Sequence, residues 1–238
     1  METALETRIN EHGKIKINLP NPIEMIQLFT IFGDKCSGTN FLEEAMLANF
    51  SLHTTADFGH KHYFPYAIPK NDRADRTLFL GIVRDPYKWL FSYYSNPFEI
   101  PRENRLLSRF LFAPYTSKLW NHTERYASIF EARVIKTRFL LQTMPSLVKH
   151  YYFVKYEDLR DNYNTILTAI ETKFHLRRRF PMFQPIRYYK KNKNVTFQIN
   201  TKTFDAGTLQ AIAKRLDKQL EMSLGYLSES KDPQIGTS

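Results

Sequence analysis

Short apolar runs and helical patterns alternate along most of this chain. Residues 78–83 are apolar throughout, which is typical of a strand buried on both faces of a sheet. Near the C-terminus, leucines and isoleucines recur at helical spacing up to Leu224, and Gly225 follows as a C-cap. The same patterns predict strands over 25–32, 78–83 and 151–155, and helices over 40–48, 86–94, 126–141, from 156 to about 174, and 209–224.

Strands that alternate with helices predict an α/β protein with a central parallel sheet between helices, in three layers. Ligands of such sheets bind at the carboxyl ends of the strands, so the ends at Gly33, Arg84 and Tyr156 are of interest. We expect one domain over 23–228, an N-terminal extension over 1–22 and a tail over 229–238. The aperiodic, cation-rich stretch 175–204 is interpreted as a lid or acceptor-facing loop.

Composition narrows the class of protein. The chain has 238 residues, of which 42% are hydrophobic, and a formal net charge of +10 that favours anionic partners. No apolar run approaches the roughly 20 residues of a membrane span, and the N-terminus lacks the apolar segment of a secretory signal. A single cysteine, Cys36, fits a reducing compartment. These features predict a cytoplasmic protein.

The first predicted strand leads into a glycine loop and then a helix. Gly33 and Gly38 have the G-x-x-x-x-G spacing of a phosphate-binding loop, but Thr39 and Asn40 stand where a nucleotide triphosphatase has Lys and then Ser or Thr. Backbone N–H groups and the helix dipole still favour an anion here. An amide in place of the magnesium-binding hydroxyl argues against magnesium-dependent triphosphate hydrolysis. The remaining lysine, Lys35, lies inside the loop.

The second strand end supplies a further anion-binding pattern. Arg84 ends the strand, Pro86 opens a helix, and Ser92 lies about two turns into that helix. A guanidinium fork and a hydroxyl at these positions suit a second phosphate.

The two strand ends together resemble the sulfotransferases that use 3′-phosphoadenosine 5′-phosphosulfate (PAPS). That family has K/R-S-G-T-T or R-x-S-G-T-N for the 5′-phosphosulfate and R-[DN]-P-x5-S-[YFW] for the 3′-phosphate. This chain has K-C-S-G-T-N at 35–40 and R-D-P-Y-K-W-L-F-S-Y-Y at 84–94. Segments similar to the family's Y-E-D-L and L-E-x-x-L-G-Y stand at 156–159 and 220–226. The resemblance covers roughly residues 25–227 and implies a P-loop NTPase-like sulfotransferase fold.

The resemblance implies a set of donor-binding residues and no metal. The acceptor is unknown: a glycan or a small molecule with a hydroxyl or amine. Nucleic acid is not an expected partner, no membrane span is expected, and the oligomeric state stays open. The residues expected to bind PAPS, or its product adenosine 3′,5′-bisphosphate, are Gly33, Lys35, Cys36, Ser37, Gly38, Thr39, Asn40, Arg84, Ser92 and, from a basic loop, Arg187, Lys190 and Lys191.

Sulfuryl transfer also requires a base and a cation at the leaving group. The family places a lysine and a histidine before a proline ahead of the second motif, which makes His62 the expected base, with His60 as the alternative. Lys61 is expected to position or stabilise, and Lys35 to steady the leaving phosphate. In the K-S-G-T-T branch the lysine precedes the serine directly, whereas here Cys36 takes that place and Lys35 stands one residue earlier, where the R-x-S-G-T-N branch has its basic residue.

Two other classes of protein compete with this interpretation. A P-loop kinase or nucleotide hydrolase predicts a lysine after Gly38, which is absent. A non-enzymatic nucleic-acid-binding module accounts for the charge of +10 but not for two spaced phosphate motifs at strand ends.

Overall fold

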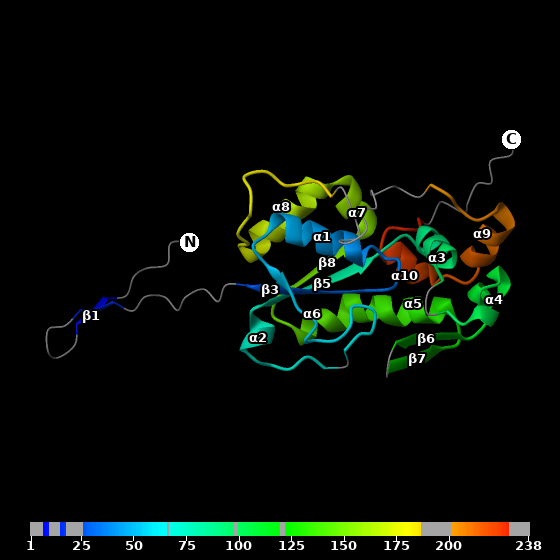
Figure 1. The fold of residues 1–238 in the computed structure, drawn as a ribbon, viewed down its shortest axis with the longest axis horizontal. Helices are drawn as coiled ribbons and strands as arrows, with labels where there is room; N and C mark the ends of the chain where they lie inside the picture. The colour runs from blue at the N-terminus through cyan, green and yellow to red at the C-terminus, as the bar shows by residue number, and fades with distance from the viewer. Residues whose placement is uncertain are drawn as a thin grey trace.

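The computed structural model describes residues 26–65, 67–97, 100–119, 122–186 and 201–228, together with the backbone of two short strands nearer the N-terminus. Those two strands, β1 (Thr7–Ile9) and β2 (Ile15–Ile17), pair antiparallel with each other. The remaining elements form an α/β structure around a central parallel sheet, as the alternating pattern predicted (Figure 1).

The central sheet has four parallel strands. Their order is β4 (His53–Thr54), β3 (Leu28–Gly33), β5 (Thr77–Val83) and β8 (Tyr151–Lys155). All residues of β5 are buried, which explains its continuous apolar run. The chain leaves β3 towards β4 on one side and returns to β5 on the other, so the strand order reverses between β3 and β5. Ligands of open parallel sheets bind at such a reversal.

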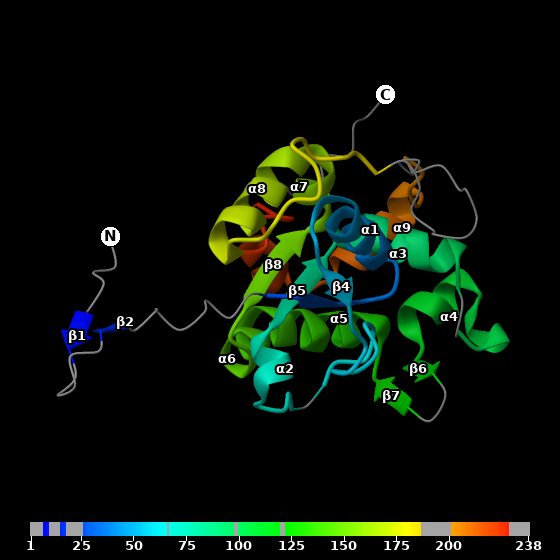
Figure 2. The ribbon, with the colours of Figure 1, turned by 60° about the vertical axis from the view of Figure 1, so that its left-hand side comes forward.

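Alternate side chains of β3 and β5 point to opposite faces of the sheet, and both faces are covered by helices. Phe29, Ile31 and Leu80 belong to one apolar cluster, whereas Phe32 and Phe79 belong to another. The helices on the first face are α1 (Thr39–Asn49), α7 (Tyr156–Asp161) and α8 (Tyr163–Phe174). Those on the second are α2 (Asp72–Asp75), α5 (Ile129–Arg138), a π-helical turn (Phe139–Thr143), α6 (Met144–Leu147) and α10 (Lys218–Ser223) (Figures 1 and 2).

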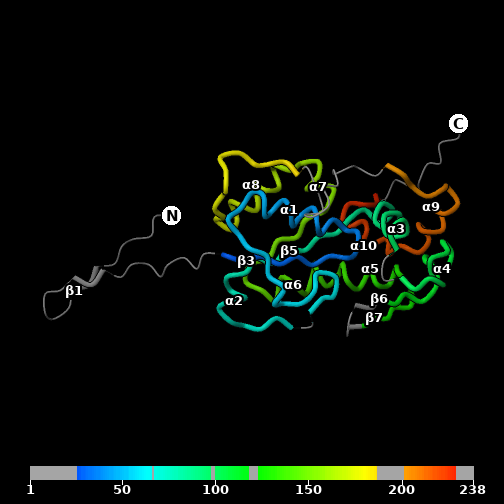
Figure 3. The backbone as a smooth tube through the Cα atoms, in the orientation of Figure 1, coloured from blue at the N-terminus to red at the C-terminus, as the bar shows by residue number. Residues whose placement is uncertain are grey.

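A third apolar cluster lies beyond the carboxyl ends of the strands. It is centred on Trp89, Tyr93 and Phe110, and its elements lie together at one end of the molecule (Figure 3). They are α3 (Pro86–Ser95), a 3-10 turn (Arg102–Asn104), α4 (Leu107–Phe112), the antiparallel pair β6 (Tyr115–Leu119) and β7 (His122–Tyr126), and α9 (Ala206–Ala213). The sequence patterns predicted neither β6 nor β7.

The observed elements are of the predicted kinds, but some predicted helices begin later or are interrupted. The predicted helix over 126–141 begins three residues later, at Ile129, where Ser128 caps it, and it passes into a π-helical turn from Phe139. The predicted helix over 209–224 is two helices, α9 and α10, because Asp217 caps a new N-terminus. Gly225 follows α10 with a φ of +73°, which confirms its role at the helix end. No helix within the described residues is long and apolar enough to cross a bilayer.

Candidate anion site at the carboxyl ends of β3 and β5

The loop after β3 is shaped by close packing against its neighbours. A Cβ atom at Gly33 would lie 2.7 Å from Ile82, so only glycine fits beside β5. Gly38 precedes α1 with a φ of +100°, and a Cβ there would lie 2.4 Å from the Tyr156 ring. Ser37 turns inward and donates its hydroxyl to the Asp34 carbonyl at 2.7 Å. No side chain caps α1, so its first N–H groups face the loop without a side-chain acceptor.

The Arg84 side chain joins the second strand end to this loop. Its Nη1 donates to the Cys36 carbonyl at 3.2 Å, and its guanidinium lies 4.8 Å from the centre of the Tyr156 ring. The Nε of Arg84 is buried and has no hydrogen-bond partner among the described residues. Tyr156 therefore supports both Gly38 and Arg84, and the two predicted phosphate motifs are in contact.

Cys36 and Ser92 also meet. Burial raises the pKa of the Cys36 thiol, and the nearby Ser92 side chain only partly offsets this, so the thiol is protonated at neutral pH. Cys36 has a φ of +63°. The arrangement places Ser92 beside the loop, as the spacing of the second motif predicted.

The two remaining segments of the resemblance converge on the Arg84–Asp85 turn. Glu157 accepts from the Asp85 amide at 3.1 Å and from the Tyr226 hydroxyl at 2.8 Å. Glu221 forms a buried ion pair with Arg133 on α5, at 2.6 Å, and Arg133 in turn donates to the Arg84 carbonyl at 3.0 Å. The acidic and tyrosine positions of these segments therefore fix the backbone that carries Arg84.

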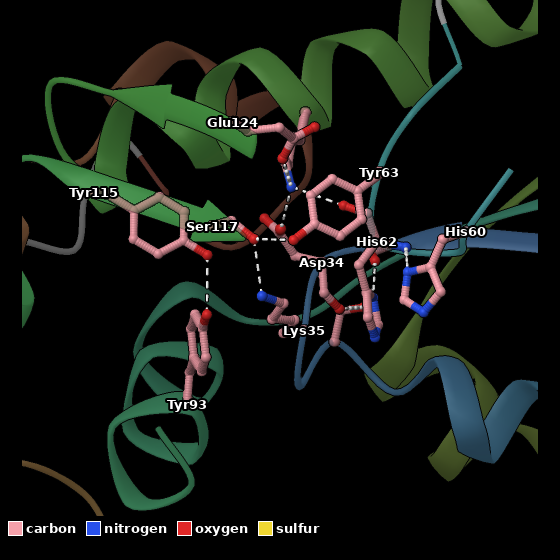
Figure 4. Close-up of polar contacts among 12 residues, drawn as sticks. Asp34, Lys35, His60, His62, Tyr63, Tyr93, Tyr115, Ser117 and Glu124 are labelled. Carbon is pink, nitrogen blue, oxygen red and sulfur yellow. Dashed lines mark hydrogen bonds and ion pairs between the residues drawn. The ribbon is translucent and has the colours of Figure 1, made fainter. Parts of the chain in front are cut away.

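Lys35 points away from α1. Its side chain is 2% exposed, and its Nζ donates to Ser117 on β6 at 2.8 Å (Figure 4). The Tyr63 hydroxyl contacts the same Ser117 oxygen at 2.8 Å, and the Lys35 carbonyl accepts from the Trp89 indole. The structure thus places this ammonium between the loop and the β6–β7 pair.

Lys136 on α5 is a charged residue of the site that sequence analysis missed. Its Nζ lies 2.8 Å from Glu124 on β7, 3.3 Å from Asp34 in the loop and 2.9 Å from the His62 carbonyl. Burial lowers the pKa of Lys136, but the two carboxylates outweigh that effect and raise it above its ordinary value. No local pattern marks Lys136, since its partners come from three distant segments.

The two candidate bases differ in environment. The Nδ1 of His62 lies 2.8 Å from the Gly33 carbonyl, which requires a proton on Nδ1 and leaves the Nε2 lone pair available. Burial lowers the pKa of His62 to about 3, so the ring is neutral at pH 7. His60 accepts from the His62 amide through Nδ1 at 3.3 Å, which favours a proton on its Nε2 instead. Their ring centres lie 5.2 Å apart.

The Lys61 side chain contacts the first turn of α1. Its Nζ donates to the Asn40 side chain at 2.5 Å and lies 3.5 Å from Glu43, and its carbonyl accepts from the Gly33 amide. Lys61 therefore places an ammonium against a side chain of the first turn of α1, whereas the Lys35 ammonium bonds Ser117 on β6.

The basic loop expected over the 3′-phosphate, with Arg187, Lys190 and Lys191, lies outside the described residues. The first part of the expected lid, residues 175–186, packs against the C-terminal end of α1. There the Asn49 side chain exchanges hydrogen bonds with the backbone of Gln184, and the Phe50 carbonyl accepts from Arg179. This part lies at the opposite end of α1 from the glycine loop.

Comparisons with protein-family models, with curated proteins and with solved structures found no match.

Proposed function

We propose that this protein is a PAPS-dependent sulfotransferase with a P-loop NTPase-like sulfotransferase fold. The observation that carries the proposal is the contact between the two phosphate motifs, in which Arg84 reaches the Cys36 carbonyl beside the uncapped N-terminus of α1. Two anion-binding groups that are adjacent at a strand-order reversal suit a nucleotide with phosphates on both its 3′ and 5′ positions.

The chemistry is in-line transfer. The acceptor oxygen attacks sulfur and forms the new S–O bond, while the bond from sulfur to the 5′-phosphate oxygen breaks and adenosine 3′,5′-bisphosphate leaves with that electron pair. The acceptor's proton passes to Nε2 of His62, whose Nδ1 is held by the Gly33 carbonyl. Positioning and cationic stabilisation supply the remainder of the rate enhancement.

Lys61 is the cation that we assign to the transferring group. Its Nζ lies on Asn40 at the first turn of α1, whereas the buried Nζ of Lys35 bonds Ser117 on the opposite side of the loop. Lys35 was first expected at the leaving oxygen. Under this assignment it instead stabilises the conformation of the loop through its bond to Ser117. A Lys61→Met variant should lose turnover with little loss of bisphosphate binding. In contrast, Lys35→Met should weaken bisphosphate binding as well.

One titration tests the proposal. The melting temperature is followed while adenosine 3′,5′-bisphosphate, and separately ATP with magnesium, is added, because a ligand that binds the folded state stabilises it. We expect a rise with the bisphosphate and none with ATP. A rise with ATP and magnesium alone would favour a kinase or nucleotide hydrolase and would refute the proposal.

A pair of arginine variants tests the 3′-phosphate assignment. Arg84→Ala should weaken bisphosphate binding by more than about tenfold, because a charge-assisted contact is lost. Arg160→Ala is the matched control, since its guanidinium also lies against the Tyr156 ring, at 5.8 Å, but pairs with Asp161. Equal affinity in the two variants would show that Arg84 does not bind the nucleotide.

A further inference from the structure

A pocket of about 220 Å³ lies beside the candidate site, at the β4 edge of the sheet. It is open to solvent on one side and is bordered by β3, by α1 and by the segment that follows β4. Its walls include Glu43 from α1, Thr54 from β4, and Ala56, His60 and Lys61 from the segment that follows, over Phe29 and Ile31 of β3. Its volume is below that of a drug-sized site and suits a single ring.

The pocket exists because β4 ends early. Thr55 donates its amide to Phe29, and the Gly33 amide reaches Lys61, so the chain meets β3 at two points and arches away between them. The register of β3 directs the backbone amides and carbonyls of its odd-numbered residues towards this edge. The amide and carbonyl of Ile31 therefore face the arch, and a ligand there meets a backbone donor and acceptor.

The walls mix hydrogen-bonding groups of both kinds with an apolar floor. Glu43 and Lys61, which lie 3.5 Å apart and are each a little over a quarter exposed, provide a carboxylate acceptor and an ammonium donor side by side. Thr54 is exposed at the rim, and Ile31 and Ala56 are apolar. Paired opposite charges suit a neutral, polyhydroxylated ligand, whose hydroxyls both donate and accept. Of the two aromatic residues in the wall, Phe29 is fully buried, so a phenol would find no exposed aromatic face except the His60 ring.

We propose that this pocket binds one neutral sugar ring and that this sugar is the sulfuryl acceptor. The second half of the proposal rests on the proposed function. Lys61 forms a wall of the pocket and at the same time contacts Asn40 on the first turn of α1, so the pocket adjoins the position assigned to the transferring group. A sugar hydroxyl that points towards Lys61 attacks sulfur, and its proton passes to His62, whose ring lies 5.2 Å from that of His60 in the wall.

Sugar binding is tested first without any donor. Saturation-transfer NMR with the full chain uses methyl α-D-glucopyranoside, methyl β-D-galactopyranoside and 4-nitrophenol as probes. We expect binding of at least one glycoside and none of 4-nitrophenol. Ala56→Trp, which fills the pocket, should abolish it. Glu43→Gln, which keeps the size of the side chain and removes its charge, should weaken it about tenfold. Ala169→Trp, at an exposed position on α8, is the matched control and should bind normally.

Transfer of labelled sulfate from PAPS to the same probes is then compared with the bisphosphate melting shift. We expect Ala56→Trp to lose transfer to the glycoside while it keeps a normal melting shift. Normal glycoside binding in Ala56→Trp and Glu43→Gln, or binding and sulfation of 4-nitrophenol alone, would overturn the pocket assignment and leave the sulfotransferase proposal intact. Pocket-dependent glycoside binding without any bisphosphate shift would refute the sulfotransferase and the acceptor role, yet keep the sugar site.

Discussion

Two buried regions of this molecule are held together by different forces. The core between the sheet and α1, α7 and α8, here called the apolar cluster, consists of hydrophobic side chains such as Leu42, Leu80 and Leu159, all with no exposed surface. The region at the carboxyl ends of β3 and β5, here called the charged network, buries Lys35, Arg133, Lys136 and Glu221, each 4% exposed or less.

The difference shows how each region depends on the rest of the chain. Apolar packing requires volume and shape, and many sequences satisfy it. A buried charge is costly unless a partner is placed beside it, and the partners here come from distant segments, as with Arg133 and Glu221. Tyr156 belongs to the apolar cluster and also lies beneath Arg84, so it joins the two regions.

The largest effect is expected from separating the buried pair of the charged network. Glu221→Ala leaves the Arg133 guanidinium buried without its carboxylate, which should cost about 4 kcal/mol of unfolding free energy in urea. The double variant Arg133→Met/Glu221→Leu should recover most of that loss, because no charge is left unpaired. Asp161→Asn, in the exposed pair with Arg160, should change stability by less than about 1 kcal/mol. A small loss in Glu221→Ala would mean that the network is not held by its charges.

A cavity in the apolar cluster should have the next largest effect. Leu80→Ala removes a fully buried side chain from β5 and should cost about 3 kcal/mol in the same urea measurement. Ile135→Ala, at a half-exposed position on α5, is the control and should cost less than about 1 kcal/mol. Under the proposed function, bisphosphate affinity of Leu80→Ala below its melting temperature should stay within about twofold of the original, since ΔΔG values of separate sites add. A large loss of affinity would show that the two regions are coupled.

The junction of the two regions is tested by a pair of glycine variants. Gly38→Ala places a Cβ against the Tyr156 ring at a φ of +100°, whereas Gly59→Ala has a similar φ of +107° and meets only an ordinary van der Waals contact, 3.8 Å from the Tyr63 carbonyl oxygen. Both variants carry backbone strain, so their difference measures the contact with Tyr156. We expect Gly38→Ala to lose about 2 kcal/mol more than Gly59→Ala by thermal unfolding. Equal losses would show that the Tyr156 ring moves aside freely.

A fall in pH should lower the free energy of unfolding through His62, by a smaller amount than the three preceding changes. The pKa of His62 is about 3 in the fold, whereas an unfolded histidine titrates near 6.5. The unfolded chain then binds the extra proton below pH 6.5, so this group lowers stability as the pH falls from about 6.5 towards 3 and has no effect above that range. His62→Gln keeps an N–H donor for the Gly33 carbonyl and removes the titration. Between pH 7.5 and 5.5 the original protein should lose about 1 kcal/mol more than this variant; parallel losses would place the pKa of His62 near its ordinary value.

The sequence patterns predicted three of the four strands of the central sheet and most of its flanking helices, because burial periodicity is a local property. The continuous apolar run of β5, the helix start at Pro86 and the helix end at Gly225 are read from neighbouring residues, and the structure has them there. The edge strand β4 and the β6–β7 pair escaped prediction, since two-residue and half-polar strands carry little periodicity.

At the candidate site, the spacing of Gly33, Gly38, Arg84 and Ser92 indicated which residues meet. The spacing did not indicate which partner each lysine of the site contacts. Lys35 and Lys61 are both close to the loop in the structure, yet one bonds Ser117 beneath it and the other Asn40 at the start of α1. Lys136 carries no motif at all.

The sequence by itself determined the alternation of strand and helix, the two glycines of the loop and the arginine at the second strand end, because each depends on chain neighbours a few residues apart. Only the tertiary structure decided which lysine faces α1, which ring nitrogen of His62 is held, and that the edge of β3 opens into a pocket. Those outcomes depend on segments that meet across 21 to 82 positions of sequence, where the direction of a side chain is set by packing and by the partner available for its charge.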